Sequence, residues 1–137
     1  MTVRFADAEP NGLAELVGRL IDGNLEAEPE RRRLLREAGV ELIASDADVR
    51  ATVVLSRGVV EISNGPPDRD PHLRVAARSD DLIELSTSPL RFGLPDALDP
   101  RGRAVLGGIA TRRVRVSGMV RHPLRLSRFT RLLSVVA

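Results

Sequence analysis

The sequence has no cysteine, no lysine, no tryptophan and no tyrosine, and three phenylalanines are its only aromatic residues. Without cysteine there can be no disulfide, thiolate nucleophile or thiolate metal site. Without lysine, Schiff-base catalysis and a lysine-containing phosphate loop are excluded. The scarcity of aromatic rings also disfavours base stacking on single-stranded nucleic acid. The core must therefore consist mainly of Leu, Val, Ile and Ala.

Long apolar runs and a leader-like start are also missing. No apolar stretch approaches the length of about 20 residues that a membrane-spanning helix needs. The first ten residues carry acids instead of a basic head before an apolar run, so we expect a cytoplasmic protein. The chain has 137 residues, of which 42% are hydrophobic and 29% charged, as in soluble globular proteins. We expect a single domain spanning residues 1–137.

Charge is distributed unevenly along the chain. The last 38 residues carry nine arginines and no acid, whereas the first 99 carry 12 arginines and all 19 acids. We favour the interpretation that the C-terminal arginines pair with acids of the N-terminal helices inside one fold. The alternative is a basic face for anionic lipid headgroups or a partner. The lysine-free, arginine-rich composition is typical of a high-GC bacterium.

Residues 1–48 are predicted to form a helical N-terminal part. Asn11 can cap a helix whose apolar residues recur at helical spacing as far as Gly23, and Pro29 opens a second helix that reaches residue 39. Its arginines, residues 31–33, are expected to form a solvated face. Residues 40–44 are a candidate for a short strand.

The chain from residue 49 to residue 137 is predicted to form a sheet with a C-terminal helix. Alternating residues and the turn Arg57-Gly58 predict a hairpin over residues 49–63, followed by a strand from His72 and a helix capped by Ser79 or Asp80. Residues 113–118 alternate as a strand, and Pro123 opens the last helix. The apolar side of that helix is expected to carry Leu124, Phe129, Leu132, Leu133 and Val136.

Residues 89–111 are apolar but interrupted by proline and glycine, which favours short helical turns. Such a segment suits the wall of a ligand cavity, a core flap or a dimer surface. The sequence is compatible with all three.

Few residues are suited to catalysis or metal binding. His72 and His122 each lie beside a proline and belong to no Ser/His/Asp spacing, so we expect peripheral roles. The pattern Asp68-x-Asp70-x-His72 lacks the glycine and distal Glu of a calcium loop and the paired ligands of a zinc site. We therefore predict no catalytic residue, no metal and no cofactor.

From residue 49 to residue 136 the sequence resembles the sterol carrier protein 2 family. The matching stretches are the hairpin ATVVLSRGVVEIS, the strand-to-helix stretch PHLRVAARSDDLIEL, the broken apolar segment and the closing RRVRVSGMVRHPLRLSRFTRLL. Residues 79–85 match the S-x-D-L-x-x-L pattern of the family, and residues 114–118 match its V-x-V-x-G strand. The link over residues 87–104 is longer and richer in proline than the short G-x-x-x-P link of the family.

The resemblance implies an α/β (α+β) fold with a mixed, mainly antiparallel sheet of about five strands and helices packed on one face. It also implies a non-catalytic lipid carrier, with a fatty acid, acyl-CoA or sterol-like ligand in an apolar cavity between sheet and helices. Family analogy predicts that the cavity is lined by Leu82, Leu85, Leu90, Phe92, Leu94, Leu106, Ile109, Met119, Leu126, Phe129 and Leu133.

A second hypothesis is an interaction or dimerisation module with a filled core, which would pack against another copy or an enzyme subunit. Transient contact with an anionic membrane surface is compatible with either hypothesis. A nucleic-acid partner is not expected, because the basic strand residues alternate with valine and not with side chains that read bases.

Overall fold

The computed structural model describes residues 2–82, 90–91, 94–95, 115–118 and 120–133. Residues 79–82 are helical. The other elements in this part of the chain are, in order, β1 (Val3–Phe5), α1 (Gly12–Ala27), the 3-10 helix η1 (Pro29–Leu34), β2 (Ala38–Ala44), β3 (Val49–Ser56), β4 (Val59–Asn64), β5 (Leu73–Ala77), β6 (Leu90–Arg91), β7 (Leu94–Pro95), β8 (Arg115–Ser117) and α4 (Pro123–Leu133).

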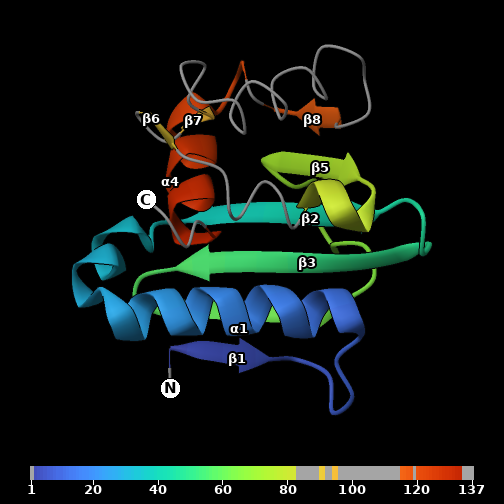
Figure 1. Cartoon of the computed structure of the whole chain (residues 1–137), viewed down its shortest axis with the longest axis horizontal. Helices are drawn as coiled ribbons and strands as arrows, with labels where there is room; N and C mark the ends of the chain where they lie inside the picture. The colour runs from blue at the N-terminus through green and yellow to red at the C-terminus, as the bar shows by residue number, and fades with distance from the viewer. Residues whose placement is uncertain (1, 83–89, 92–93, 96–114, 119, 134–137) are drawn as a thin grey trace.

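Six strands form one mixed sheet in the spatial order β1-β4-β3-β2-β5-β8 (Figure 1). The pairs β2–β3, β3–β4 and β5–β8 are antiparallel, and β1–β4 and β2–β5 are parallel. The predicted α+β class and mixed sheet are confirmed. The strand count is one above the expected five because β1 was not predicted. β6 and β7 form a separate antiparallel pair.

The predicted hairpin is confirmed as β3 and β4. Ser56 pairs with Val59 across the turn. Gly58 has a φ of 73°, a left-handed conformation that glycine adopts without steric cost. The alternation of the sequence places one side of each strand in the core and most of the other side toward solvent, with Thr52 as a buried exception.

Besides its helices, the N-terminal part contains β2 at the predicted strand candidate and β1, which was not predicted. α1 begins after the predicted cap Asn11, whose side chain accepts a backbone N–H of the first turn, but it runs past Gly23 to Ala27. The second predicted helix is shorter than expected, because η1 ends at Leu34 and β2 begins at Ala38.

The strand candidate at residues 40–44 is confirmed as β2, which lies between β3 and β5. Alternate β2 side chains enter the core on the helix side of the sheet. On the opposite side Glu41 is only 1% exposed, with Arg74 Nε 2.5 Å from its Oε1 and Arg50 Nη1 3.4 Å from its Oε2. These two guanidinium groups compensate the burial of the carboxylate, which would otherwise be costly.

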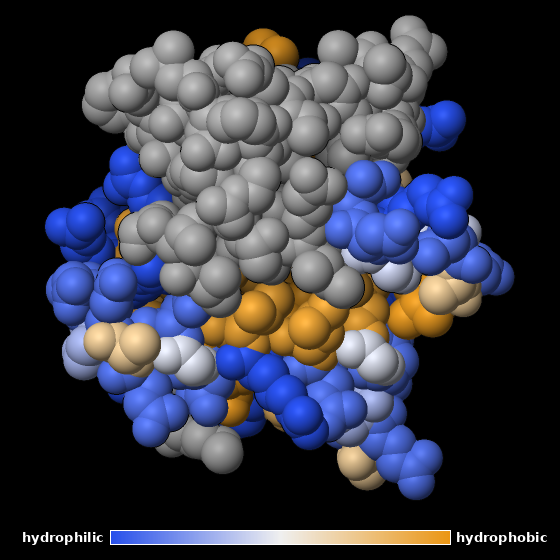
Figure 2. Space-filling view, in the orientation of Figure 1, coloured by the Kyte–Doolittle hydropathy of each residue, from blue (hydrophilic) through white to orange (hydrophobic). Residues whose placement is uncertain are grey.

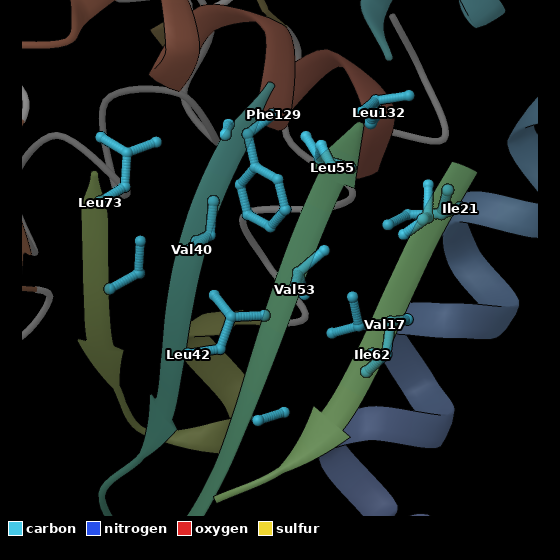
Figure 3. Packing of buried hydrophobic residues seen from close by; sticks show 14 of the residues in the cluster. Val17, Ile21, Val40, Leu42, Val53, Leu55, Ile62, Leu73, Phe129 and Leu132 are labelled. Carbon is cyan, nitrogen blue, oxygen red and sulfur yellow. The ribbon is translucent and has the colours of Figure 1, made fainter. Parts of the chain in front are cut away.

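α1 and α4 pack on one face of the sheet, as predicted. Val17 and Ile21 of α1 converge with Phe129 and Leu132 of α4 on the inner face of β2, β3 and β4 (Figure 3). These four side chains are at most 4% exposed. None of the helices in the described ranges is long and apolar enough to cross a membrane.

β8 forms one edge of the sheet, and the glycine that follows it has a structural role. Val116 pairs with Val75 of β5. Gly118 has a φ of 88°, and a Cβ added there would lie 2.0 Å from the carbonyl oxygen of His72. Only glycine fits this close approach. The last residue of the V-x-V-x-G pattern is thereby explained.

The expected pairing of C-terminal arginines with N-terminal acids is not found in the described part of the chain. The ion pairs there are Arg4–Glu61, Arg19–Glu15, Arg31–Glu28, Arg50–Glu41 and Arg74–Glu41. α4 is instead held by hydrogen bonds to its carbonyl groups. Asn24 Nδ2 donates to Leu132 O at 2.7 Å, and Arg31 Nη1 donates to Arg131 O at 3.0 Å. Arg31 is thus buried and not solvated as predicted.

Candidate ligand-binding site

The structure covers part of the predicted cavity lining. Side chains are described for Leu82, Leu126, Phe129 and Leu133, and only the main chain for Leu90 and Leu94, which lie in the paired strands β6 and β7. The predicted lining residues outside the described part of the chain are Leu85, Phe92, Leu106, Ile109 and Met119.

The α4 members of this set belong to the apolar core. Leu126 and Phe129 are 6% and 1% exposed, and Leu133 packs against the same cluster. The ring of Phe129 lies over the sheet, between Val40 and Leu55 (Figure 3). In the described residues, this end of the predicted site is filled with protein side chains.

One residue of the predicted apolar side of α4 faces the other way. Leu124 is 71% exposed, whereas Leu126, Phe129 and Leu132 are buried. The buried residues recur every three positions and form one stripe, and Leu124 lies on the opposite side of the helix. The prediction that Leu124 faces the core is therefore wrong, and Leu126 takes its place.

An apolar hollow of about 240 Å³ lies at the other end of β2 and β3, where the start of α1 meets the β2–β3 turn and the helical residues 79–82. Leu82 forms part of its wall and also packs against the core. Leu16 is 37% exposed, so the hollow reaches solvent. Figure 2 shows apolar side chains gathered in the middle of the face that carries α1. The lining comprises Gly12, Leu13, Leu16, Ala44, Ala47, Val49, Ser79 and Leu82.

Asp46 in the β2–β3 turn holds residues 79–82 beside this hollow. Its Oδ1 accepts hydrogen bonds from the backbone N–H and the hydroxyl of Ser79, both at 2.9 Å. The backbone hydrogen bond, followed by that of the hydroxyl, lowers the pKa of Asp46. The carboxylate is therefore ionised at neutral pH and anchors the start of the helical segment.

The opposite face of the sheet carries polar side chains next to the exposed Val54. A groove of about 600 Å³ lies between β3, β4 and the proline-rich loop after Asn64, and its lining includes Thr52, Glu61 and Asp70. Thr52 Oγ1 donates to Gly65 O at 2.9 Å and ties the loop to the sheet. In the part of the chain that the structure describes, no three His, Asp or Glu side chains are grouped so that they could hold a metal ion.

The two histidines, which the sequence separates by fifty positions, are in contact. Their ring centroids are 5.0 Å apart in an edge-on arrangement. Gly39 N–H donates to His72 Nδ1 at 2.9 Å, and Arg125 Nη1 lies 3.0 Å from His122 Nδ1. The histidine pair joins the start of β5 to the start of α4, which is a structural role.

Sequence reasoning missed the α1 and β3 side of the hollow. Leu13 and Leu16 were assigned to the buried face of a helix, and Val49 to a strand. The available signal was the position of Leu16 at the flank of the apolar stripe, where a side chain is only half covered.

Comparison with solved structures shows that this chain has the sterol carrier protein 2 fold. A structure of sterol carrier protein 2 matches 87% of this chain and 94% of that chain, with a TM-score of 0.50 and 12% sequence identity. The UbiJ-SCP2 ubiquinone synthesis protein matches 91% of this chain and 96% of that chain, with a TM-score of 0.62 and 16% identity. The predicted resemblance in fold is confirmed.

The same fold occurs inside a larger enzyme. Pisa1, a stereoselective inverting sec-alkylsulfatase from Pseudomonas sp., matches 89% of this chain with a TM-score of 0.53 and 15% identity, but the match spans 16% of the enzyme. No protein-family model matches this chain, and no curated protein matches its sequence.

Proposed function

We propose that residues 1–137 form one non-catalytic carrier domain for a fatty acid, acyl-CoA or sterol-like ligand, acting in the cytoplasm. The observation that carries the proposal is the apolar hollow at Leu16 and Leu82, on the helix side of a sterol carrier protein 2 fold. Each acyl methylene buried there would contribute about 0.8 kcal/mol. The acyl chain supplies the affinity, and no bond is broken.

The arrangement of the core favours the Leu82 end as the ligand-binding end. Leu82 shares its hollow with Ala44, the last residue of β2, whereas Phe129 lies beside Val40 near the start of that strand. At about 3.3 Å per residue the two ends are about 13 Å apart. Leu42, between them, is 2% exposed. We propose that the ligand enters at the hollow and that Phe129 supports the cavity from the core.

The test combines extraction with titration. The purified protein is extracted with organic solvent, the extract is examined by mass spectrometry, and a fluorescent fatty acid is then titrated. We expect saturable binding that Leu16→Gln weakens by about tenfold, because the amide places a polar group in the hollow. Leu124→Gln, the same change on an exposed helix face, should leave it unchanged. If the extract contained no lipid and the fluorescent fatty acid showed no saturable binding, the lipid-carrier proposal would be refuted.

The alternative function is an interaction module that pairs with another copy or with an enzyme. Two observations favour it: the close-packed surroundings of Phe129 and the occurrence of this fold as one part of the Pisa1 chain. Light scattering over a wide concentration range tests self-association. A dimer without bound lipid would favour the interaction module, and a monomer at every concentration would exclude the homodimer.

A further inference from the structure

A basic groove of about 780 Å³ lies between the end of η1, with the residues that follow it, and the β3–β4 turn, separate from the apolar hollow. Its polar lining residues are Arg32, Arg33, Arg36, Glu37, Ser56 and Arg57. Four guanidinium groups from two stretches of chain, residues 32–37 and 56–58, thus face one concavity that contains one carboxylate.

Most of these arginines are not used by the fold. In the described residues, the exposed side chains of Arg33, Arg36 and Arg57 have no hydrogen bond or ion pair, and the side chain of Arg32 makes one hydrogen bond, to Thr2 Oγ1 at 2.7 Å. Arg31 differs from them, because it is buried and bonded to Glu28 and to α4. The dipole of η1 could explain why Arg32 and Arg33 occur near the end of this helix. It does not explain Arg57, because Arg57 belongs to the β3–β4 hairpin.

The positive charge continues onto α4. Burial, followed by the charges of Arg36 and Arg125, lowers the pKa of Arg128. Repulsion between these groups is unfavourable for folding alone. A bound anion would relieve this repulsion and also meet the unused donors of the groove.

We propose that this groove binds a phosphate or pyrophosphate group. The planar guanidinium fork donates two parallel hydrogen bonds to a phosphate and remains charged at all physiological pH values. Four such forks offer more donors than the two oxygens of a carboxylate can accept, whereas a pyrophosphate has enough oxygens for all of them. The hydroxyl of Ser56 adds one more donor at the wall.

The site is distinct from the proposed lipid cavity. Ser56, at the groove, and Val49, at the hollow, are the two ends of β3, which are about 23 Å apart at about 3.3 Å per residue. The core between them is filled, so one ligand cannot occupy both sites. The phosphate is therefore that of a second, free ligand or of a lipid headgroup at a bilayer surface.

The test uses two variants of equal net charge. Arg33→Gln/Arg36→Gln/Arg57→Gln removes unused groove arginines, and Arg19→Gln/Arg69→Gln/Arg78→Gln removes exposed arginines outside the groove lining. Inorganic pyrophosphate is titrated by calorimetry. In parallel, vesicles of phosphatidylcholine with and without phosphatidylglycerol are used in co-sedimentation.

We expect the groove variant to lose affinity by at least about tenfold and the charge-matched control by less than about twofold. If this difference occurs with pyrophosphate, the ligand is a free phosphate compound. If it occurs only with phosphatidylglycerol vesicles, the ligand is a headgroup. No binding of either probe by the wild type, or equal losses in the two variants, would overturn the site. Fatty-acid binding should be unchanged in both variants, so this test is independent of the lipid-carrier test.

Discussion

His72 is the residue whose surroundings most clearly determine its ionisation. Burial, followed by the charges of Arg125 and His122, lowers its pKa from the ordinary value of 6.5, and Glu37 acts in the opposite direction. Its Nδ1 accepts the Gly39 N–H, which only an unprotonated nitrogen can do. The neutral ring is therefore part of the folded state.

The protein should lose stability as the pH falls below 6.5, the value of the unfolded histidine. In that window the unfolded state binds more protons than the folded state, so acidification favours unfolding. Urea denaturation at pH 7.5 and pH 5.5 measures the effect. His72→Asn keeps an acceptor for the Gly39 N–H but cannot titrate, so its stability should fall less between the two pH values. Parallel losses in the variant and the wild type would assign the pH dependence to other groups.

At the scale of single residues, the sequence predicted the role of a residue better than its contact partners. Asn11 was identified as a helix cap because its type and position suffice for that role. The contact between His72 and His122 was missed, since it depends on β5 and α4 starting side by side. The burial of Glu41 was missed for the same reason, because Arg74 lies opposite it only in the β2–β5 register.

At the scale of elements, long periodic patterns were predictable and short ones were not. The β3–β4 hairpin and α4 have clear periods and matched their predicted positions. β1 has three residues and is specified by parallel pairing of Val3 with Val60, far along the chain. β2 is buried on both faces and lacks the alternation that marks a strand, so the sequence indicated a candidate at residues 40–44 but not that the strand begins at Ala38.

Asn11 connects α1 to the sheet, and its replacement tests how much that connection contributes. Its Oδ1 accepts from Ala14 N–H, its Nδ2 donates to Arg50 O, and its own N–H donates to Asn64 Oδ1, each at 2.8 Å. Asn11→Ala should lower the free energy of unfolding in urea by about 1–2 kcal/mol. Asn11→Ser keeps a cap acceptor and places no second acceptor against the carbonyl oxygen of Arg50, so it should cost less. Equal costs would mean that the cap itself contributes little.

At the scale of the whole molecule, the charge asymmetry of the sequence did not predict how charges pair. In the ion pairs of the described residues, acids of the N-terminal half pair with arginines of the same half, by i,i+4 spacing for Glu15 and Arg19 and by strand register for Glu61 and Arg4. The composition gives the number of charged residues but does not specify which face of the fold carries each of them. Among the C-terminal arginines that the structure describes, Arg125 donates to the carbonyl group of Glu37, and none forms an ion pair with an N-terminal acid.

The largest difference between the predicted cavity and the observed structure lies at α4, which was predicted to line the cavity and instead packs into the core. Phe129 is 1% exposed and is the only aromatic side chain in the described core cluster. Because truncation of this buried ring would leave a cavity in the core, Phe129→Ala should lower the free energy of unfolding by about 3–5 kcal/mol. Leu124→Ala on the same helix, at a residue that is 71% exposed, should change it by less than about 0.5 kcal/mol.

Urea denaturation followed by circular dichroism measures both variants, and Phe129→Leu completes the series. Leucine keeps the site apolar with a smaller side chain, so we expect a cost of about 1–2 kcal/mol and unchanged fatty-acid affinity. That combination would assign Phe129 to the core and the ligand to the Leu82 hollow. A cost below about 1 kcal/mol for Phe129→Ala, with altered fatty-acid affinity, would instead mean that the ring borders an open cavity.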